Sequence, residues 1–172
     1  MFDIRPVDNT PATGRALASL LIDTVASGGS VSFMHPLSQD DADAFWSGAL
    51  AAAEAGKRLI LGAFEGETLI ASVTLLLDCP PNQPHRAEIA KLMTAVSHRG
   101  RGAARALMID AERQAAARGR TLLVLDTATE GGASGLYESL GYQYAGTIPE
   151  YALKPHGGLT GTMLYWKRIG EA

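Results

Sequence analysis

Cysteine is almost absent from this sequence, and its scarcity excludes two ways of stabilising a fold. The single cysteine, Cys79, has no partner for an internal disulfide and cannot make a four-ligand zinc site by itself. The four histidines show no metal-ligand spacing, so we expect no metal site. A chain of 172 residues needs neither device, because it can bury roughly 70% of the surface that its unfolded form exposes.

Long apolar runs are also missing. A membrane-spanning helix needs about 18 or more apolar residues in succession, and no such run occurs. Residues 1–5 lack the basic and apolar regions of a signal peptide. With 47% hydrophobic and 19% charged residues, the composition is that of a globular protein. We therefore expect one soluble, cytoplasmic domain over residues 1–172, with no membrane partner.

Excess basic charge is absent from the chain as a whole, whose net charge is −3. Residues 86–120 nevertheless contain eight basic and three acidic side chains, which leaves a net charge of −8 on the remainder. A protein with this distribution lacks the extended basic face that nucleic-acid binding requires. The charge pattern argues against a nucleic-acid partner and favours a site for one anionic small molecule.

Apolar periodicity and capping residues predict eleven elements in the order β-α-α-β-β-β-α-β-α-β-β. The expected strands are residues 2–7, 58–64, 68–77, 86–95, 121–126, 142–148 and 160–168, and the expected helices are 11–27, 39–55, 102–118 and 133–140. This order predicts an α/β fold, a mixed sheet with helices on both faces. Phe45 and Ala104 are expected on buried helix stripes, and residues 122–125 in a strand covered on both faces.

The most informative segment follows the strand 86–95 and reads His98-Arg99-Gly100-Arg101-Gly102-Ala103-Ala104. It opens a helix, and the unpaired N–H groups and partial positive charge of a helix N-terminus bind phosphate. Its glycines let the backbone approach a ligand closely, and its arginines, with Arg105, add charge. The motifs for nucleoside triphosphates and dinucleotides are absent. An ordinary glycine-containing loop with solvated arginines is the plainer interpretation.

The pattern Arg99-x-x-Gly102-x-Ala104 resembles the R/Q-x-x-G-x-G/A signature of the GNAT acyltransferases, and 136–142 resembles their second signature. The resemblance implies the GNAT acyltransferase fold, with a mostly antiparallel central sheet of six to seven strands and about four helices. It also implies acetyl-coenzyme A as co-substrate. The residues implied to bind it are Leu92, Met93, Thr94, Arg99, Gly100, Arg101, Gly102, Ala103 and Ala104.

Further segments resemble the members of this family that confer resistance to tabtoxin. These segments are 23–25, 29–34, 86–93, 125–127 and 165–167, and the similarity extends over nearly the whole chain. The sequence departs from those members at Leu136 and at 131–132, on the acceptor side. The resemblance implies an N-acetyltransferase that acts on the amine of a small molecule, a toxin or antibiotic such as tabtoxinine-β-lactam.

Two carboxylates are candidates for the chemistry of the amine. An amine with a pKa of about 10.4 is mostly protonated near neutral pH, so transfer of an acetyl group to it requires a proton acceptor. Glu88 lies on the strand before the turn, and Asp126 ends the next buried strand, at the edge where open α/β sheets place their sites. The resemblance implies that Glu88 is the general base, acting through water, and that Asp126 is its partner and binds the amine. A solvent-facing strand residue and a turn residue are the alternatives.

The remaining candidates come from the helix 133–140, the strand 86–95 and the loop between the first two helices. The resemblance implies that Tyr137 protonates the coenzyme A thiolate and that the N–H of Met93 stabilises the oxyanion. For Tyr137, packing in the core remains an alternative. Ser32, Phe33 and Met34 are candidates for the acceptor wall together with the two carboxylates, although an ordinary loop accounts for them as well.

Two other functions remain open. An acetyltransferase of peptide or protein amines would need a wide acidic groove, whose presence one sequence does not determine. A non-catalytic sensor of acyl-coenzyme A would keep the fold without turnover. The sensor is disfavoured because it has no chemical need for Glu88, Asp126 and Tyr137 together.

Overall fold

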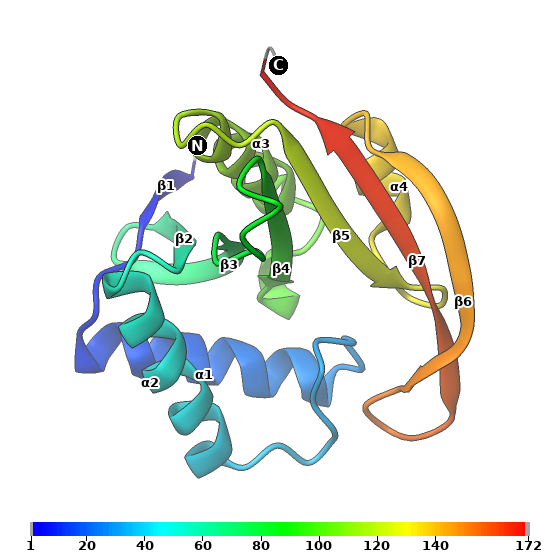
Figure 1. The fold of residues 1–172 in the computed structure, drawn as a ribbon. Helices are drawn as coiled ribbons and strands as arrows, with labels where there is room; N and C mark the ends of the chain where they lie inside the picture. Colours follow the sequence, from blue (N-terminus) through cyan, green and yellow to red (C-terminus); the bar gives the residue numbers. More distant parts are fainter. Residues whose placement is uncertain (1, 171–172) are drawn as a thin grey trace.

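The periodic segments of the sequence assemble into one seven-stranded sheet with the order β1-β2-β3-β4-β5-β7-β6 (Figure 1). The structure is a computed structural model and describes residues 2–170. The strands are β1 (Asp3–Pro6), β2 (Arg58–Glu65), β3 (Thr68–Leu76), β4 (Arg86–Thr94), β5 (Leu122–Ala128), β6 (Gln143–Leu153) and β7 (Leu159–Arg168). The helices are α1 (Pro11–Ala26), α2 (Gln39–Glu54), α3 (Ala103–Ala116) and α4 (Ser134–Ser139), with the 3-10 turn η1 (Val96–His98) before α3.

The predicted order of elements and the mixed, mostly antiparallel sheet are confirmed. Only β4 and β5 are parallel neighbours among the described strands; the other neighbouring pairs are antiparallel. All predicted boundaries but one lie within two residues of those in the structure, and the exception is the end of β6. Strand β6 continues to Leu153 instead of ending near Ile148, because its ladder with β7 resumes after an irregularity. Helix α3 ends at Ala116 rather than near Arg118.

Local capping explains where the first two helices begin. The Thr10 side chain accepts a hydrogen bond from the N–H of Thr13 at 3.2 Å, and Pro11 occupies the first turn. Ser38 accepts from the N–H of Asp41 at 3.1 Å and donates its hydroxyl to the Asp41 carboxylate at 2.7 Å. These contacts depend on residues three apart, which is why the sequence was sufficient to predict them.

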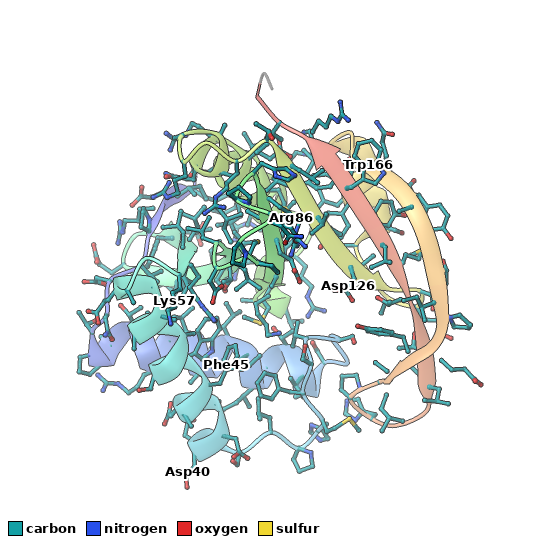
Figure 2. All side chains as sticks on the ribbon, in the orientation of Figure 1. Asp40, Phe45, Lys57, Arg86, Asp126 and Trp166 are labelled. Atoms are coloured by element: carbon teal, nitrogen blue, oxygen red, sulfur yellow. The ribbon has the colours of Figure 1, made fainter. Side chains whose placement is uncertain are left out.

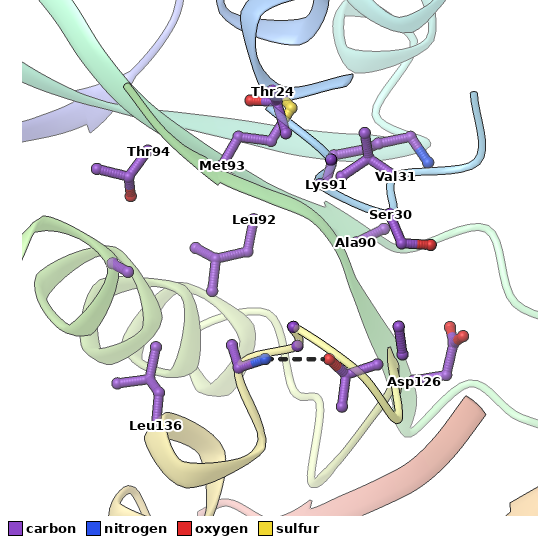
Figure 3. A pocket seen from close by; sticks show the side chains of 18 of the residues that line it. Thr24, Ser30, Val31, Ala90, Lys91, Leu92, Met93, Thr94, Asp126 and Leu136 are labelled. Carbon is purple, nitrogen blue, oxygen red and sulfur yellow. Dashed lines mark hydrogen bonds between the residues drawn. The ribbon is translucent and has the colours of Figure 1, made fainter. Parts of the chain in front are cut away.

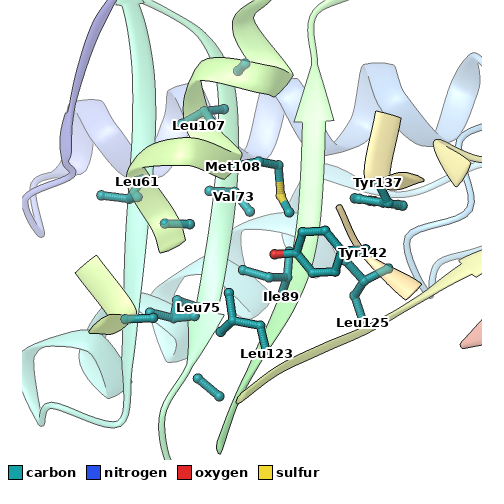
Figure 4. Close-up of a cluster of buried hydrophobic side chains, with 14 of the residues drawn as sticks. Leu61, Val73, Leu75, Ile89, Leu107, Met108, Leu123, Leu125, Tyr137 and Tyr142 are labelled. Carbon is teal, nitrogen blue, oxygen red and sulfur yellow. The ribbon is translucent and has the colours of Figure 1, made fainter. Parts of the chain in front are cut away.

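The helices cover both faces of the sheet. Helices α1 and α2 pack on β2, β3 and β4 on one face, and α3 packs on the other (Figure 1). Figure 4 shows the larger buried cluster, in which Leu107 and Met108 of α3 meet Val73 of β3 and Leu123 of β5. Within residues 2–170, no helix is long and apolar enough to cross a membrane.

Three predictions about buried side chains were wrong in part. Trp46 is fully buried on α2, whereas Phe45 is half-buried at the edge of the same stripe. On α3 the core position is Ala103, and Ala104 is only partly buried, beside the cleft described below. Strand β5 is not covered on both faces: Val124 is half-buried, because α1 and α2 pack over β2–β4 rather than over β5.

Strands β4 and β5 separate after a short ladder, and this separation creates the site. They pair only from Arg86 opposite Leu122 to Glu88 opposite Val124. Beyond Glu88, β4 continues beside β3 while β5 continues beside β7, so the two strands diverge (Figure 1). The remaining residues of β4 therefore present backbone groups that β5 does not pair, in the middle of the sheet.

Candidate active site

A cleft of about 790 Å³ lies where β4 and β5 diverge. The residues that line it come from seven segments: 24–32, 89–94, 98–105, 126–128, 131–137, 151–153 of β6 and 160–162 of β7. Figure 3 shows Leu92 and Leu136 toward one side of this cleft and Lys91 and Val31 toward another, with Asp126 near the end of β5. The cleft thus joins the predicted phosphate turn to the predicted acceptor side.

The turn before α3 forms an anion cradle. Gly102 is the N-cap residue of α3 with a φ of 89°, and Gly100 has a φ of 74°, both in the left-handed region that favours glycine. Within residues 2–170, the backbone N–H groups of residues 100–105 have no hydrogen-bond acceptor. A Cβ on Gly102 would meet no atom within 4 Å, so the backbone at this point is open to a ligand. These features fit a pyrophosphate.

The arginines of the turn have different partners. Arg99 and Arg105 line the cleft; their guanidinium groups donate to the Ser27 hydroxyl at 2.8 Å and to the Ser139 hydroxyl at 2.6 Å. Arg101 does not line it, because its guanidinium binds the Glu65 carboxylate at 2.6 Å. The hydrogen bond from Arg101, followed by that from His98, lowers the pKa of Glu65. The structure therefore places the Arg99 side chain at the cradle and that of Arg101 outside it.

Asp126 lies in the cleft, whereas Glu88 lies beside it. One Asp126 carboxylate oxygen accepts the Thr162 hydroxyl at 2.7 Å. Glu88 pairs with the Arg86 guanidinium at 3.3 Å and is not among the lining residues. Because Glu88 is in register with Val124, two residues before Asp126, both carboxylates belong to the same face of the sheet. Figure 2 shows Asp126 and Arg86 on the neighbouring strands β5 and β4.

Tyr137 is both a core residue and a lining residue of the cleft. It is only 6% exposed on α4 and packs edge-on against Tyr142, with ring centroids 6.0 Å apart. Burial, helped by the negative charge of Asp126, raises the pKa of Tyr137 to about 12. The phenol therefore keeps its proton well above neutral pH.

The other predicted residues divide between the cleft and its surroundings. Leu92, Met93, Thr94, Gly100, Gly102, Ala103, Ala104 and Ser32 line the cleft. Phe33 and Met34 do not: Phe33 packs edge-to-face on Phe45, with ring centroids 5.2 Å apart, and Met34 is 45% exposed.

Sequence reasoning missed several lining residues. Lys91 and Thr162 belong to no motif that could be recognised in the sequence, because strand register decides whether their side chains reach the cleft. Gly132, in contrast, was predicted on the acceptor side and does line the cleft: a Cβ there would lie 2.4 Å from the Ala128 carbonyl oxygen, so glycine is required.

The fold and the site together define an α/β enzyme that binds a phosphate-bearing cofactor across a split sheet. Residues 14–142 match the model of the Acetyltransferase (GNAT) family, which is most of the chain. The protein belongs to this family. It is an acetyltransferase, and acetyl-coenzyme A (acetyl-CoA) is the co-substrate of this family.

Solved structures of similar fold cover almost the whole chain. An N-acetyltransferase from Staphylococcus aureus Mu50 has a TM-score of 0.82 at 18% identity, covering 99% of both chains. An acetyltransferase structure from Salmonella typhimurium, with its cofactor acetyl-CoA, has a TM-score of 0.81 at 18% identity, covering 99% of this chain and 95% of the other. The ribosomal-protein-alanine N-acetyltransferase from Brucella melitensis has a TM-score of 0.80 at 19% identity, covering 97% and 99%. At these identities the likeness shows the fold.

Replacing Gly102 with leucine is expected to raise the Kd for acetyl-CoA roughly 10- to 100-fold, because a side chain would occupy the space that the phosphates approach. Titration calorimetry measures this change without an acceptor. Gly119→Leu is the matched control: Gly119 has a φ of 71° and follows the opposite end of α3, so it shares the backbone strain but not the cradle. An unchanged Kd for Gly102→Leu would contradict the phosphate-binding role of the turn.

Arg105→Ala is expected to weaken acetyl-CoA binding roughly 10- to 100-fold, as for a lost hydrogen bond to a charged group. Arg101→Ala is expected to change the Kd by less than about threefold, because its guanidinium is exposed and engaged with Glu65. The same calorimetric titration compares both variants. Equal losses for the two would show that Arg101 leaves Glu65 to bind the cofactor.

Proposed function

We propose that this enzyme transfers the acetyl group of acetyl-CoA to the amine of a small, amino-acid-like molecule. The observation that carries the proposal is the presence of the Asp126 carboxylate and the Tyr137 phenol in the lining of the cleft that also contains the anion cradle. A carboxylate attracts a cationic amine, and a protonated phenol can supply a proton to a departing thiolate. Acetyl-CoA supplies the activated acyl group.

The phosphate end and the acceptor end of the cleft have distinct residues. The N–H groups of 100–105, with Arg99 and Arg105, would hold the pyrophosphate. The backbone of Leu92 and Thr94 would hold the pantetheine arm. These assignments follow the GNAT signature and agree with the lining of the cleft. Met93 was predicted as the oxyanion donor, but it lies two residues before Ala95, whose N–H donates to Ile70 of β3, so the N–H of Met93 also faces β3 and not the cleft.

The two carboxylates, Asp126 and Glu88, would have different roles in deprotonating the acceptor amine. Asp126, inside the cleft, would bind the ammonium form of the acceptor. Glu88, outside the lining but on the same face, would accept the proton through water. Tyr137, with its pKa of about 12, would remain protonated until the thiolate leaves.

The particular acceptor that we propose is tabtoxinine-β-lactam, and the enzyme would then act in resistance to that toxin. The proposal rests on the similarity of segments 23–25, 29–34, 86–93, 125–127 and 165–167 to tabtoxin-resistance acetyltransferases. Four of the segments contribute to the cleft lining, at Thr24, 29–32, 89–93 and 126–127. The departures at 131–132 and Leu136 also fall in the lining, so they alter the cavity rather than the surface.

The test is thiol release from acetyl-CoA across a panel of amines that includes tabtoxinine-β-lactam and short peptides. Release that depends on tabtoxinine-β-lactam, and that is lost in Glu88→Gln, supports the reaction and the acceptor. Activity with other small amines alone keeps the reaction and rejects the toxin. Activity with peptides alone favours acetylation of peptide amines. Acetyl-CoA binding without release from any amine would support the sensor.

A further inference from the structure

Lys91 lies at an irregularity in β4. The ladder with β3 shifts there, so that Lys91 and Leu92 both stand opposite Val73. The φ of Lys91 is 52°, in the left-handed region that a lysine rarely adopts. Regular alternation would place Lys91 on the α3 face with Ile89, but a bulge redirects the side chains that follow it. Its ammonium lies instead on the α1–α2 side (Figure 3).

The surroundings of the Lys91 ammonium hold it in the wall of the cleft. The Lys91 Nζ donates to the Ser32 hydroxyl at 3.1 Å and lies 5.6 Å from the centroid of the Phe45 ring and 6.0 Å from that of Phe33. These distances are within the range of cation–π attraction. Ser32 also has a positive φ, 75°, so two non-glycine residues in the left-handed region meet here. Such strain often accompanies a functional site.

The charge of Lys91 has no carboxylate partner. For residues 2–170, no carboxylate oxygen lies within 4.0 Å of its ammonium. Burial lowers the pKa of Lys91, while the charges of Asp126 and Glu88 act in the opposite direction. Asp126 accepts the Thr162 hydroxyl instead. The cleft therefore contains a cation, Lys91, and a carboxylate, Asp126, that interact electrostatically but do not form an ion pair.

We infer that Lys91 is a specificity-determining residue that binds the carboxylate of an amino-acid-type acceptor, while Asp126 holds the amine of the same molecule. The inference rests on the proposed function and specifies its substrate class. Separated opposite charges in one cleft complement a small zwitterion. An amine at the start of a peptide, or on a lysine side chain within one, has no free carboxylate beside it. Lys91 would thus favour free amino acids over peptide amines.

The experiment compares acids with their esters. Thiol release is measured with L-methionine, L-glutamate and L-lysine and with their α-methyl esters, which keep the amine and lose the α-carboxylate. The unmodified enzyme is expected to prefer each acid roughly 10- to 100-fold in kcat/KM, chiefly through KM. Lys91→Met removes the charge at similar length and is expected to abolish the preference. Lys91→Arg is expected to restore part of it, because a guanidinium also binds carboxylates.

Lys154→Met is the matched control. Lys154 pairs with Glu130 at 3.0 Å and does not line the cleft, so this variant should keep the acid preference. Acetyl-CoA binding by calorimetry verifies that each variant is folded. Equal use of acid and ester by the unmodified enzyme, or a preference that survives in Lys91→Met, overturns the inference and leaves the proposed function intact. No thiol release from any acid, ester or amine of the panel contradicts the proposed function and the inference together.

Discussion

Tyr137→Phe is expected to lower kcat roughly 10²- to 10⁴-fold while the Kd for acetyl-CoA stays unchanged. The variant removes one oxygen from a side chain that lines the cleft but keeps the ring that packs against Tyr142. A general acid acts in the transition state, so its loss should appear in kcat rather than in cofactor binding. Thiol release with the best acceptor of the panel, together with calorimetry, separates the two effects.

Tyr142→Phe is the control for a purely structural effect. Tyr142 is 3% exposed and lies outside the lining of the cleft. Its kcat should stay close to that of the unmodified enzyme. Loss of folding in Tyr137→Phe, or equal losses in both variants, would identify Tyr137 as a core residue only.

The pH dependence gives an independent test of Tyr137. A general acid must be protonated to act, and the pKa of this phenol is raised to about 12. Activity that depends on it should therefore persist above pH 10, the usual pKa of a tyrosine, and decline only as the pH approaches 12. A decline of kcat centred near pH 10, absent in Tyr137→Phe, would show that the protein environment does not raise the pKa of Tyr137.

Glu88→Gln is expected to lower kcat roughly 10²- to 10⁴-fold if Glu88 is the base. Asp126→Asn is expected to raise the KM for the acceptor as well, because Asp126 lies in the cleft where the ammonium would bind. The acidic limb of the pH–rate profile distinguishes the two roles: it should disappear in Glu88→Gln and persist in Asp126→Asn. The reverse pattern would assign the base to Asp126.

Glu130→Gln is the control for a general change of charge. Glu130 lies two residues after the end of β5; it is exposed, pairs with Lys154 and does not line the cleft. The variant should keep both the rate and the profile. A loss comparable to that of Glu88→Gln would mean that the two carboxylates act only through the net charge of this region.

Local sequence features could predict most of the fold. The caps at Thr10 and Ser38 and the stripe of Leu17, Leu21 and Val25 involve residues within a few positions of one another, and the structure contains all of them. The turn before α3 could be found for the same reason, since its glycines and arginines are consecutive. Interactions of this range involve neighbouring residues, so they can be predicted without knowledge of the tertiary contacts.

Distant partners decided which residues of the turn face the cleft. Arg101 and Arg105 are equivalent in the sequence, but Glu65, from the β2–β3 hairpin, binds Arg101. The resemblance predicted Arg101 as a cofactor ligand; its N–H belongs to the cradle, whereas its guanidinium is held outside the cleft by Glu65. Phe33 was likewise predicted for the acceptor wall and instead packs against Phe45 of α2.

By itself, then, the sequence determined the order of the elements, the ends of α1 and α2, and the glycine turn after β4, because each depends on neighbouring residues. Only the tertiary structure decided that Asp126 enters the cleft while Glu88 stays outside its lining, and that Lys91 turns into its wall. Those positions depend on where β4 leaves β5 and where the β3–β4 register shifts. Strand register is set by pairing between distant segments, and a shift of one residue exchanges the two faces of a strand.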